Sequence, residues 1–254
     1  MDADALRRPK EGGRRRQSRG VLQLPTCLQR RVDLDRSMKA GGAGHGVSGA
    51  YDDKDQEVLF EEEGLGPEAL ETRGDGFVVT ARRWSSSWRF RAFSEDAALV
   101  IAHEYKEAAL AYVLAGNWRK AASAFGNQAV QILKACRDPD RELELHAAFA
   151  LLRSARCYRK IPDKDKDELA AAEVAFEKAI SLYSQGNASR KAANCCRELA
   201  EFYEEQEEWH SALRYFEEAA DYYGATADCN PYYKPYCDDK ARKMGCIVAR
   251  VKFM

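Results

Sequence analysis

An aromatic motif recurs along the second half of the chain and strongly limits what the chain can fold into. The motif is a tyrosine, a tryptophan six residues later and a phenylalanine seven residues after that. A middle copy lacks the tryptophan and has five extra residues in its turn. The copies are Tyr112, Trp118 and Phe125; Tyr158 and Phe176; and Tyr203, Trp209 and Phe216. The tyrosines lie 46 and 45 residues apart. This period indicates stacked helical hairpins, each burying its apolar face only against its neighbours.

Helical periodicity surrounds these motifs. From Ser94 onward, apolar residues recur every three or four positions, and most breaks contain Gly or Pro. Ser94, followed by two acids, is a helix-start signal, because a hydroxyl and early carboxylates satisfy free backbone N–H groups. The spacing predicts seven helices, over 95–115, 118–135, 141–159, 167–185, 189–206, 209–224 and 236–252. Short connections between helices of this length imply antiparallel neighbours.

The sequence therefore predicts an all-α fold over residues 94–252: a tetratricopeptide-like, right-handed superhelix of antiparallel hairpins. Alanines next to the aromatic motifs allow close helix approach, at positions Ala121, Ala122, Ala124, Ala212, Ala219 and Ala220. The period is longer than the 34 residues of the tetratricopeptide repeat, and its match to that signature is loose.

Residues 1–83 differ sharply in composition. Residues 1–40 hold 11 Lys/Arg against five acids, a Gly-rich stretch follows, and residues 51–72 carry nine acids and one lysine. We find no sustained helical or strand period there, so little apolar surface is available to offset chain entropy. We expect a disordered, low-complexity extension.

Overall charge and cysteine usage narrow the class of protein. The 254-residue chain has a net charge of -1, which argues against a globally basic nucleic-acid coat. Its apolar runs are shorter than the roughly 20 residues that span a bilayer, and we recognise no signal peptide. The eight cysteines lack a disulfide-framework pattern, which favours a reduced, cytosolic compartment.

Enzyme chemistry has little support. The four histidines have no partners at metal or triad spacing, and no phosphate-loop, nucleophile-elbow or zinc-protease motif occurs. We expect no catalytic residue, metal or cofactor.

Several stretches together resemble the soluble NSF attachment proteins of the alpha/beta type. They are EAALAYVLAGNWRKAASAF at 107–125, FEKAISLYSQG at 176–186, SALRYFEEAADYY at 211–223 and ARKMGCIVA at 241–249. The resemblance covers about residues 88–250. It implies an adaptor whose basic concave face grips the four-helix SNARE bundle and whose far end recruits the hexameric ATPase NSF. It also implies peripheral membrane association from the cytoplasm, and no nucleic-acid partner.

The resemblance suggests specific SNARE-contact residues. Lys243 matches a family lysine and has Lys240 and Arg242 beside it. A second basic pair ends the third predicted helix, and a third pair begins the fifth: Arg159 and Lys160, then Arg190 and Lys191. Asn194 stands where the family has a lysine, which weakens the grip or shifts it to neighbouring bases. Ordinary solvated helix charges are the alternative interpretation.

An aromatic and basic segment at 84–93 precedes the first predicted helix. It corresponds to a mobile, hydrophobic membrane-contacting loop in the family. Aromatic rings beside arginines suit the headgroup zone of an anionic membrane. The candidate contacts are Trp84, Trp88, Phe90 and Phe93. The alternative is that Trp88 and Phe93 fold back onto the first hairpin.

Two further expectations concern the chain end and the rival functions. The sequence stops at Met254, one helix past the last clear match, where the family continues to an acidic segment. We therefore expect a truncated or divergent form that stimulates the ATPase weakly. The main rival is a general tetratricopeptide-like scaffold that binds an extended peptide. An enzyme or a nucleic-acid binder acting through the basic tail ranks last.

Overall fold

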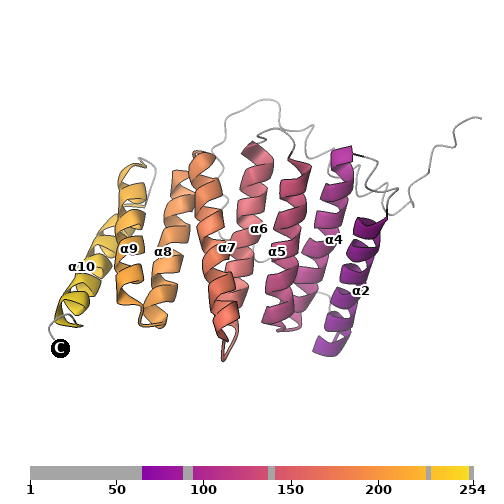
Figure 1. Cartoon of the computed structure of the whole chain (residues 1–254), viewed down its shortest axis with the longest axis horizontal. Helices are drawn as coiled ribbons and strands as arrows, with labels where there is room; N and C mark the ends of the chain where they lie inside the picture. Colours follow the sequence, from indigo (N-terminus) through magenta and orange to yellow (C-terminus); the bar gives the residue numbers. More distant parts are fainter. Residues whose placement is uncertain (1–64, 88–93, 137–140, 227–229, 252–254) are drawn as a thin grey trace, which may run out of the picture. The chain divides into compact units, whose positions relative to one another are not determined.

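The structure is a computed structural model that describes residues 65–87, 94–136, 141–226 and 230–251. Within these ranges it contains eight α-helices, and each packs against the next along the chain (Figure 1). They are α2 (Pro67–Ser86), α4 (Ser94–Leu114), α5 (Trp118–Ala135), α6 (Arg141–Lys160), α7 (Lys166–Gln185), α8 (Ser189–Glu205), α9 (Trp209–Gly224) and α10 (Tyr233–Val251).

The predicted all-α hairpin array is confirmed, and the seven predicted helices match α4 to α10. The largest shift is at α10, which begins at Tyr233 rather than at residue 236. Pro235 lies in its first turn, where a backbone N–H would have no intrahelical acceptor, so the proline does not break the helix. Asp165 and Glu168 form a capping box that fixes the start of α7.

The prediction of a disordered extension up to residue 83 is wrong for its last part, because α2 begins at Pro67. Its inward face repeats at helical spacing, through Leu70, Gly74, Phe77, Ala81 and Trp84. Gly74 and Gly76 interrupt the apolar pattern and concealed it in the sequence. The helical domain therefore starts about 27 residues earlier than predicted, and residues 1–64 lie outside the described ranges.

A glycine allows α2 to approach α4 closely. A Cβ at Gly74 would lie 2.6 Å from Cε1 of Tyr112, whose ring is buried. The Tyr112 hydroxyl donates a 2.7 Å hydrogen bond to Asp75 on α2. The first aromatic of the repeat is thus covered by a helix that the repeat does not include.

The aromatic motif forms a recurring turn between helices. The backbone N–H of Asn117 donates to the carbonyl of Tyr112, and Glu208 makes the same bond to Tyr203. The residue before each donor has a positive φ, 74° at Gly116 and 60° at Glu207. The phenylalanines at the motif ends are almost fully buried, as are the six alanines predicted to allow close packing. The stacked-hairpin interpretation of the repeat is confirmed.

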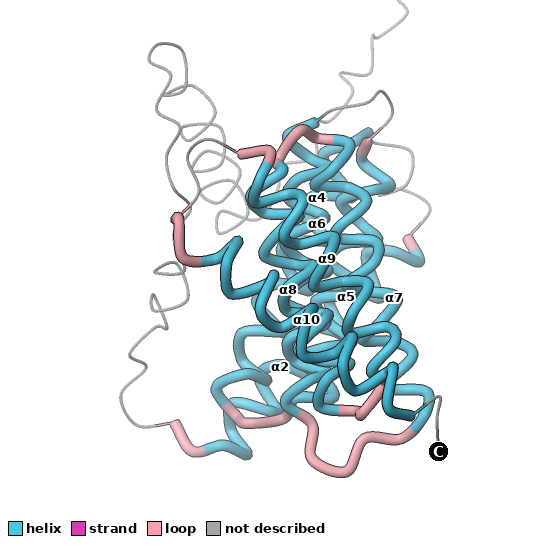
Figure 2. Tube along the Cα trace, turned by 90° about the vertical axis from the view of Figure 1, so that its left-hand side faces the viewer, coloured by secondary structure: helices cyan, strands magenta, loops and turns pink. Residues whose placement is uncertain are grey.

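Alternate helices lie in the same layer, because side-chain contacts link each helix to the next but one. Figure 2 shows the backbone of the array from the side on which α10 lies. In the α5 layer, which comprises α2, α5, α7 and α9, Lys120 pairs with Asp75, and Arg119 pairs with Glu168. Tyr215 on α9 donates to Glu177 on α7 in the same layer.

The second layer, which we name the α6 layer, comprises α4, α6, α8 and α10. Buried Ala102 and Ala147 share one apolar cluster and connect α4 to α6. Arg156 pairs with Glu198 to connect α6 to α8, and Lys240 with Glu204 connects α8 to α10. None of the eight helices in the described ranges has the length and hydropathy that a membrane-spanning helix requires.

Candidate functional site

Charge separates the two layers over the carboxy-terminal hairpins. Helices α6, α8 and α10 together carry thirteen Lys/Arg and eight Asp/Glu, whereas α7 and α9 carry three and seven. All seven predicted SNARE-contact residues lie on α6, α8 or α10. The part of the α6 layer formed by α6, α8 and α10 is therefore the basic side of these hairpins and the candidate binding surface.

The basic pair at the end of α6 divides between two roles. Arg159 forms ion pairs with Glu201 and Glu205 on α8, the former at 3.4 Å. Burial disfavours the charged guanidinium of Arg159, but these carboxylates outweigh that effect and raise its pKa. Lys160 is exposed, and its Nζ lies 4.5 Å from the centre of a Trp118 ring. Only Lys160 presents its charge outward.

The three bases on α10 differ in the same way. Lys240 is only 24% exposed, and its Nζ lies 2.7 Å from both carboxylate oxygens of Glu204. Lys243 and Arg242 are 64% and 77% exposed and share Asp239, at 2.7 and 3.5 Å. The hydrogen bond from Lys243 is the main cause that lowers the pKa of the Asp239 carboxyl. Lys240 therefore holds helices together, whereas Lys243 and Arg242 remain accessible.

The third pair lies at the other end of α8. Arg190 is exposed, and its side chain forms no ion pair or hydrogen bond within the described ranges. Lys191 is partly buried above the Tyr183 ring, 5.7 Å from its centre, and burial lowers its pKa. Arg190 lies 14 residues before Glu204, or about 21 Å along the helix. The structure thus places this pair apart from the bases near the carboxyl end of α8.

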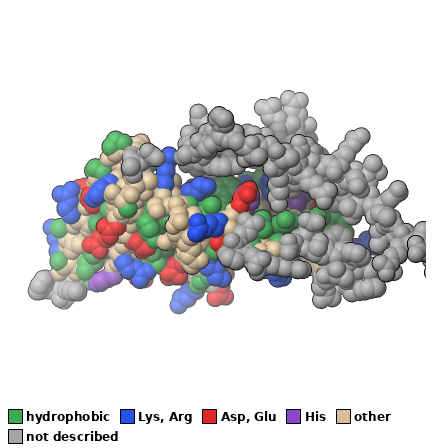
Figure 3. Space-filling model, turned by 90° about the horizontal axis from the view of Figure 1, so that it is seen from above, with side chains coloured by type: hydrophobic (Ala, Val, Ile, Leu, Met, Phe, Trp, Pro, Cys, Tyr) green, Lys and Arg blue, Asp and Glu red, His purple; other side chains and the backbone are tan. Residues whose placement is uncertain are grey.

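Charged residues of α6, α8 and α10 form an ion-pair ladder that sequence reasoning did not predict. We define it as Arg156, Arg159, Arg197, Glu198, Glu201, Glu204, Glu205 and Lys240. Most of these side chains are largely shielded, so their mutual charges are screened less than those of a surface pair. Basic and acidic side chains also lie interspersed on the side seen in Figure 3.

Sequence reasoning also missed two residues on α6. The Arg153 guanidinium lies 4.2 Å from the centre of the Phe125 ring and 5.8 Å from that of Phe149. Burial lowers the pKa of Arg153, and no carboxylate within the described ranges pairs with it. Phe149 is 42% exposed, which is unusual for a phenylalanine on a charged helix face. The i, i+4 spacing of Phe149 and Arg153 places them on one face of α6, and this was the sequence signal that could have identified the pair.

The structure changes the interpretation of the aromatic segment at 84–93. Trp84 belongs to α2, not to a loop, and packs partly buried against a cluster that contains Ala81, Ile101 and Tyr105. It is therefore part of the helical domain. Trp88, Phe90 and Phe93 lie outside the described residues.

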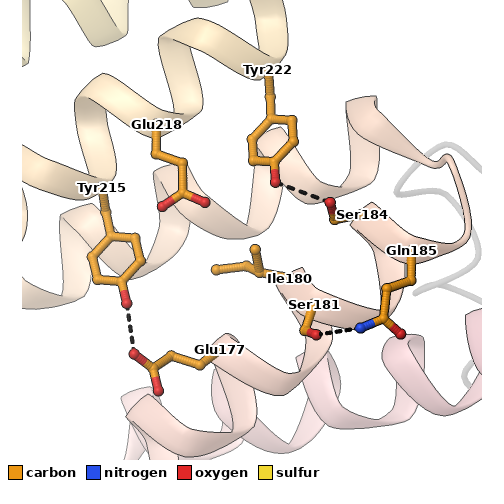
Figure 4. A pocket seen from close by; sticks show the side chains of 8 residues that line it. All are labelled: Glu177, Ile180, Ser181, Ser184, Gln185, Tyr215, Glu218 and Tyr222. Atoms are coloured by element: carbon orange, nitrogen blue, oxygen red, sulfur yellow. Dashed lines mark hydrogen bonds between the residues drawn. The ribbon is translucent and has the colours of Figure 1, made fainter.

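A pocket of about 320 Å³ lies on the opposite layer, between α7 and α9 (Figure 4). Its polar groups largely engage one another: Tyr215 donates to Glu177 at 2.7 Å, and Tyr222 donates to Ser184 at 3.2 Å. Glu218 also lines it, and no base does. The pocket belongs to the acidic side and does not extend the basic surface.

Buried thiols offer little nucleophilic chemistry. Burial is the main cause that raises the pKa of Cys157 and of Cys237 to about 11. Both are therefore protonated at neutral pH, and a protonated thiol is a weak nucleophile. The adjacent pair Cys195 and Cys196 is buried in the main core with a raised pKa as well.

Comparison with known proteins finds relatives of the helical domain. The family model described as soluble NSF attachment protein, SNAP, matches residues 73–238, beginning inside α2. The alpha-soluble NSF attachment protein of Vitis vinifera is 30% identical over 152 residues, which are 59% of this chain and 47% of that relative. The matched part thus spans about half the length of the relative. Because the family model covers well over half of the residues here, this chain belongs to the soluble NSF attachment protein family.

Proposed function

We propose that this chain is an adaptor that binds assembled SNARE complexes through α6, α8 and α10 of the α6 layer and recruits the ATPase NSF for their disassembly. The observation that carries the proposal is the excess of bases on α6, α8 and α10, opposite the acidic α7 and α9. Family membership supports the same role. The setting would be intracellular vesicle transport, in the cytoplasm and peripherally on membranes.

The physical chemistry of the α6 layer suits this role. A SNARE bundle is a rod of helices with an acidic surface, and a basic layer attracts it before contact and favours one orientation. The ion-pair ladder links three consecutive helices of the layer, so the exposed bases sit on elements of fixed spacing. Such a surface recognises a folded rod without a deep pocket.

Binding to an assembled bundle can be tested with a charge reversal and a matched control. Lys243→Glu places an acid on the α6 layer, and Lys178→Glu places one at an exposed position of α7. We expect Lys243→Glu to weaken binding to an assembled SNARE bundle about tenfold, equivalent to about 1.4 kcal/mol, and Lys178→Glu to leave it unchanged. Equal losses in both variants would remove the α6 layer from the proposal.

The partner also separates this function from the rival scaffold. An adaptor of this kind binds the folded four-helix bundle, whereas a peptide-binding scaffold prefers an extended segment. We expect the bundle to bind more tightly than its unassembled SNARE segments, measured by sedimentation with the same protein. A preference for the unassembled segments would favour the scaffold.

Membrane attachment through the aromatic segment is a separate part of the proposal. Removing residues 1–93 would delete α2 and uncover Tyr112, so point substitutions are the sharper test. We expect replacement of Trp88, Phe90 and Phe93 by alanine to reduce flotation with anionic liposomes, with binding to soluble SNARE bundle unchanged. Unaltered flotation would exclude the anchor.

A further inference from the structure

The bases of α6 and α8 fall into two groups that differ in what surrounds the charge. Near the carboxyl end of α8, Arg156 and Arg159 on α6 are matched by glutamates of the ladder. Towards the start of α8, Arg153 and Arg190 have no carboxylate partner within the described ranges. Glutamates therefore neutralise Arg156 and Arg159, whereas the charges of Arg153 and Arg190 remain available to a partner.

Arg153 is the unusual member of the second group. Its guanidinium is shielded from water between the rings of Phe125 and Phe149, whose π-faces stabilise a cation only in part. A positive charge that is shielded from water is stabilised most when an anion lies next to it. Phe125 is almost fully buried, so it fixes the position of the arginine, while the exposed Phe149 lies at the surface beside it.

Helix register brings Arg190 and Lys191 beside these two residues. The Arg156–Glu198 and Arg159–Glu205 pairs set α6 and α8 side by side and running in the same direction. Phe149 lies seven residues before Arg156 on α6, and Arg190 lies eight residues before Glu198 on α8. Along the helix axes, the two residues therefore differ in height by only about 1.5 Å. The turn before α8 confirms this placement, because a Cβ at Gly186 would lie 2.8 Å from Cδ2 of Leu145, one turn before Phe149.

We propose that Phe149, Arg153, Arg190 and Lys191 form a docking patch, the α6–α8 patch, for an acidic helical surface. A carboxylate of the partner completes the environment of Arg153, and a neighbouring apolar side chain covers Phe149. The inference rests on the proposed function, since it takes the assembled SNARE bundle as the occupant.

Charge and shape favour this occupant over an anionic membrane. The arginine is partly buried against two rings, whereas anionic lipid headgroups are usually met by clusters of exposed Lys and Arg. Arginine is one of the residues that most often dominate affinity in protein interfaces. Within the proposed function, the patch is the main anchor, and Lys243 lies outside it.

The test measures affinity for an assembled SNARE bundle at low and moderate salt, with Arg153→Gln, Arg190→Glu and Phe149→Ala. We expect each variant to bind at least about tenfold more weakly, and Arg190→Glu to reduce the salt dependence as well. Arg156→Gln, in the ladder, is the control: it should lower the melting temperature and leave affinity within about twofold. Arg190 and Phe149 are exposed, so their variants keep the test valid if Arg153→Gln folds poorly.

Each outcome decides between the two proposals. If the wild type binds and the three patch variants bind equally well, the patch is wrong and the proposed function stands. If the wild type does not bind the bundle, both are wrong. If the variants keep bundle binding but lose binding to phosphatidylserine vesicles, the surface is a membrane site and the inference is overturned.

Discussion

The first and last hairpins of the array are held together by different means. Between α2 and α4, the contact depends on close approach: Gly74 lies under the Tyr112 ring, and one hydroxyl bonds to Asp75. Across α8 to α10, stacked rings such as Tyr223 and Tyr233 are combined with an ion pair between Glu204 on α8 and Lys240 on α10. The α2–α4 contact relies on the absence of a side chain, and the α8–α10 contact on matched side chains.

This difference has a consequence for how each region responds to change. A close contact fails locally, because the clash affects one helix pair and can be relieved if α2 moves away. A buried ion pair that links helices two apart fails more widely, because it leaves a desolvated charge inside the array. Substitutions in the two regions should therefore differ in which helices lose hydrogen-exchange protection, as well as in how much they lower the free energy of unfolding.

The largest effect is expected from Glu198→Ala in the ladder. Glu198 accepts two hydrogen bonds from Arg156, at 2.6 and 2.8 Å, and is buried. Its loss leaves that guanidinium without its bidentate carboxylate, which should reduce the free energy of unfolding by about 3 kcal/mol. Urea denaturation followed by circular dichroism measures this. Glu198→Gln, which keeps one acceptor and the side-chain volume, should cost less, and an equal cost would show that packing rather than charge is responsible.

Gly74→Ala should have the next largest effect, at the other end of the domain. The new Cβ would lie 2.6 Å from a buried ring, and such overpacking costs about 2 kcal/mol. Hydrogen exchange should increase over 67–86 and stay unchanged over 233–251. Gly76→Ala is the matched control, since nothing lies within 4 Å of a Cβ there. Uniform loss of protection along the chain would remove the distinction between the two regions.

The repeat explains why the array was predictable and α2 was not. Buried aromatics at a 45–46-residue period fix the hairpins, and bounds followed from Gly, Pro and capping residues. Helix α2 is joined by a glycine contact, and a missing side chain leaves no apolar signal. A search for apolar periodicity in the sequence therefore identifies helices that bury large side chains, and it overlooks helices that pack through small residues.

The 45–46-residue period also predicts ion pairs between helices of the same layer. Partners in the same layer lie about one period apart: Arg156 and Glu198 are 42 residues apart, and Lys120 and Asp75 are 45 apart. Opposite charges at that separation therefore predict ion pairs between alternate helices. Applied to α6 and α8, this rule assigns Arg159 to the ladder. The environment of Arg153 needed three-dimensional positions, because Phe125 comes from the other layer.

Glu207→Gly should stabilise the protein by a smaller amount, about 1 kcal/mol. Glu207 has a φ of 60° in the turn between α8 and α9, and the equivalent position after Tyr112 is Gly116. Glycine adopts this conformation without strain. The control is Asn187→Gly, at a φ of 55°, where asparagine already tolerates the conformation and less is gained. Thermal unfolding of both variants compares them, and a loss of stability in Glu207→Gly would indicate a role for its side chain.

The smallest effect is a pH dependence confined to the α2 end. Hydrogen bonds from Lys120, then from Tyr112, lower the pKa of the Asp75 carboxyl. A carboxyl whose pKa is lower in the folded state stabilises that state above its unfolded pKa of about 3.9. This stabilisation is lost as the pH falls from there through the folded value. The Asp75 side chain is half exposed, so solvent screening limits the effect to about 0.5 kcal/mol or less.

Hydrogen exchange of α2 between pH 5 and pH 3, corrected for the intrinsic rate, measures this dependence. Asp75→Asn should remove the local pH dependence and leave that of α8 to α10 unchanged, because the amide does not titrate. If α2 and the ladder region lose protection together in the wild type, acid acts on the array as a whole. The contrast between a locally docked first helix and a charge-linked last hairpin then fails. Separate transitions would instead show that the two ends of the domain respond to different groups.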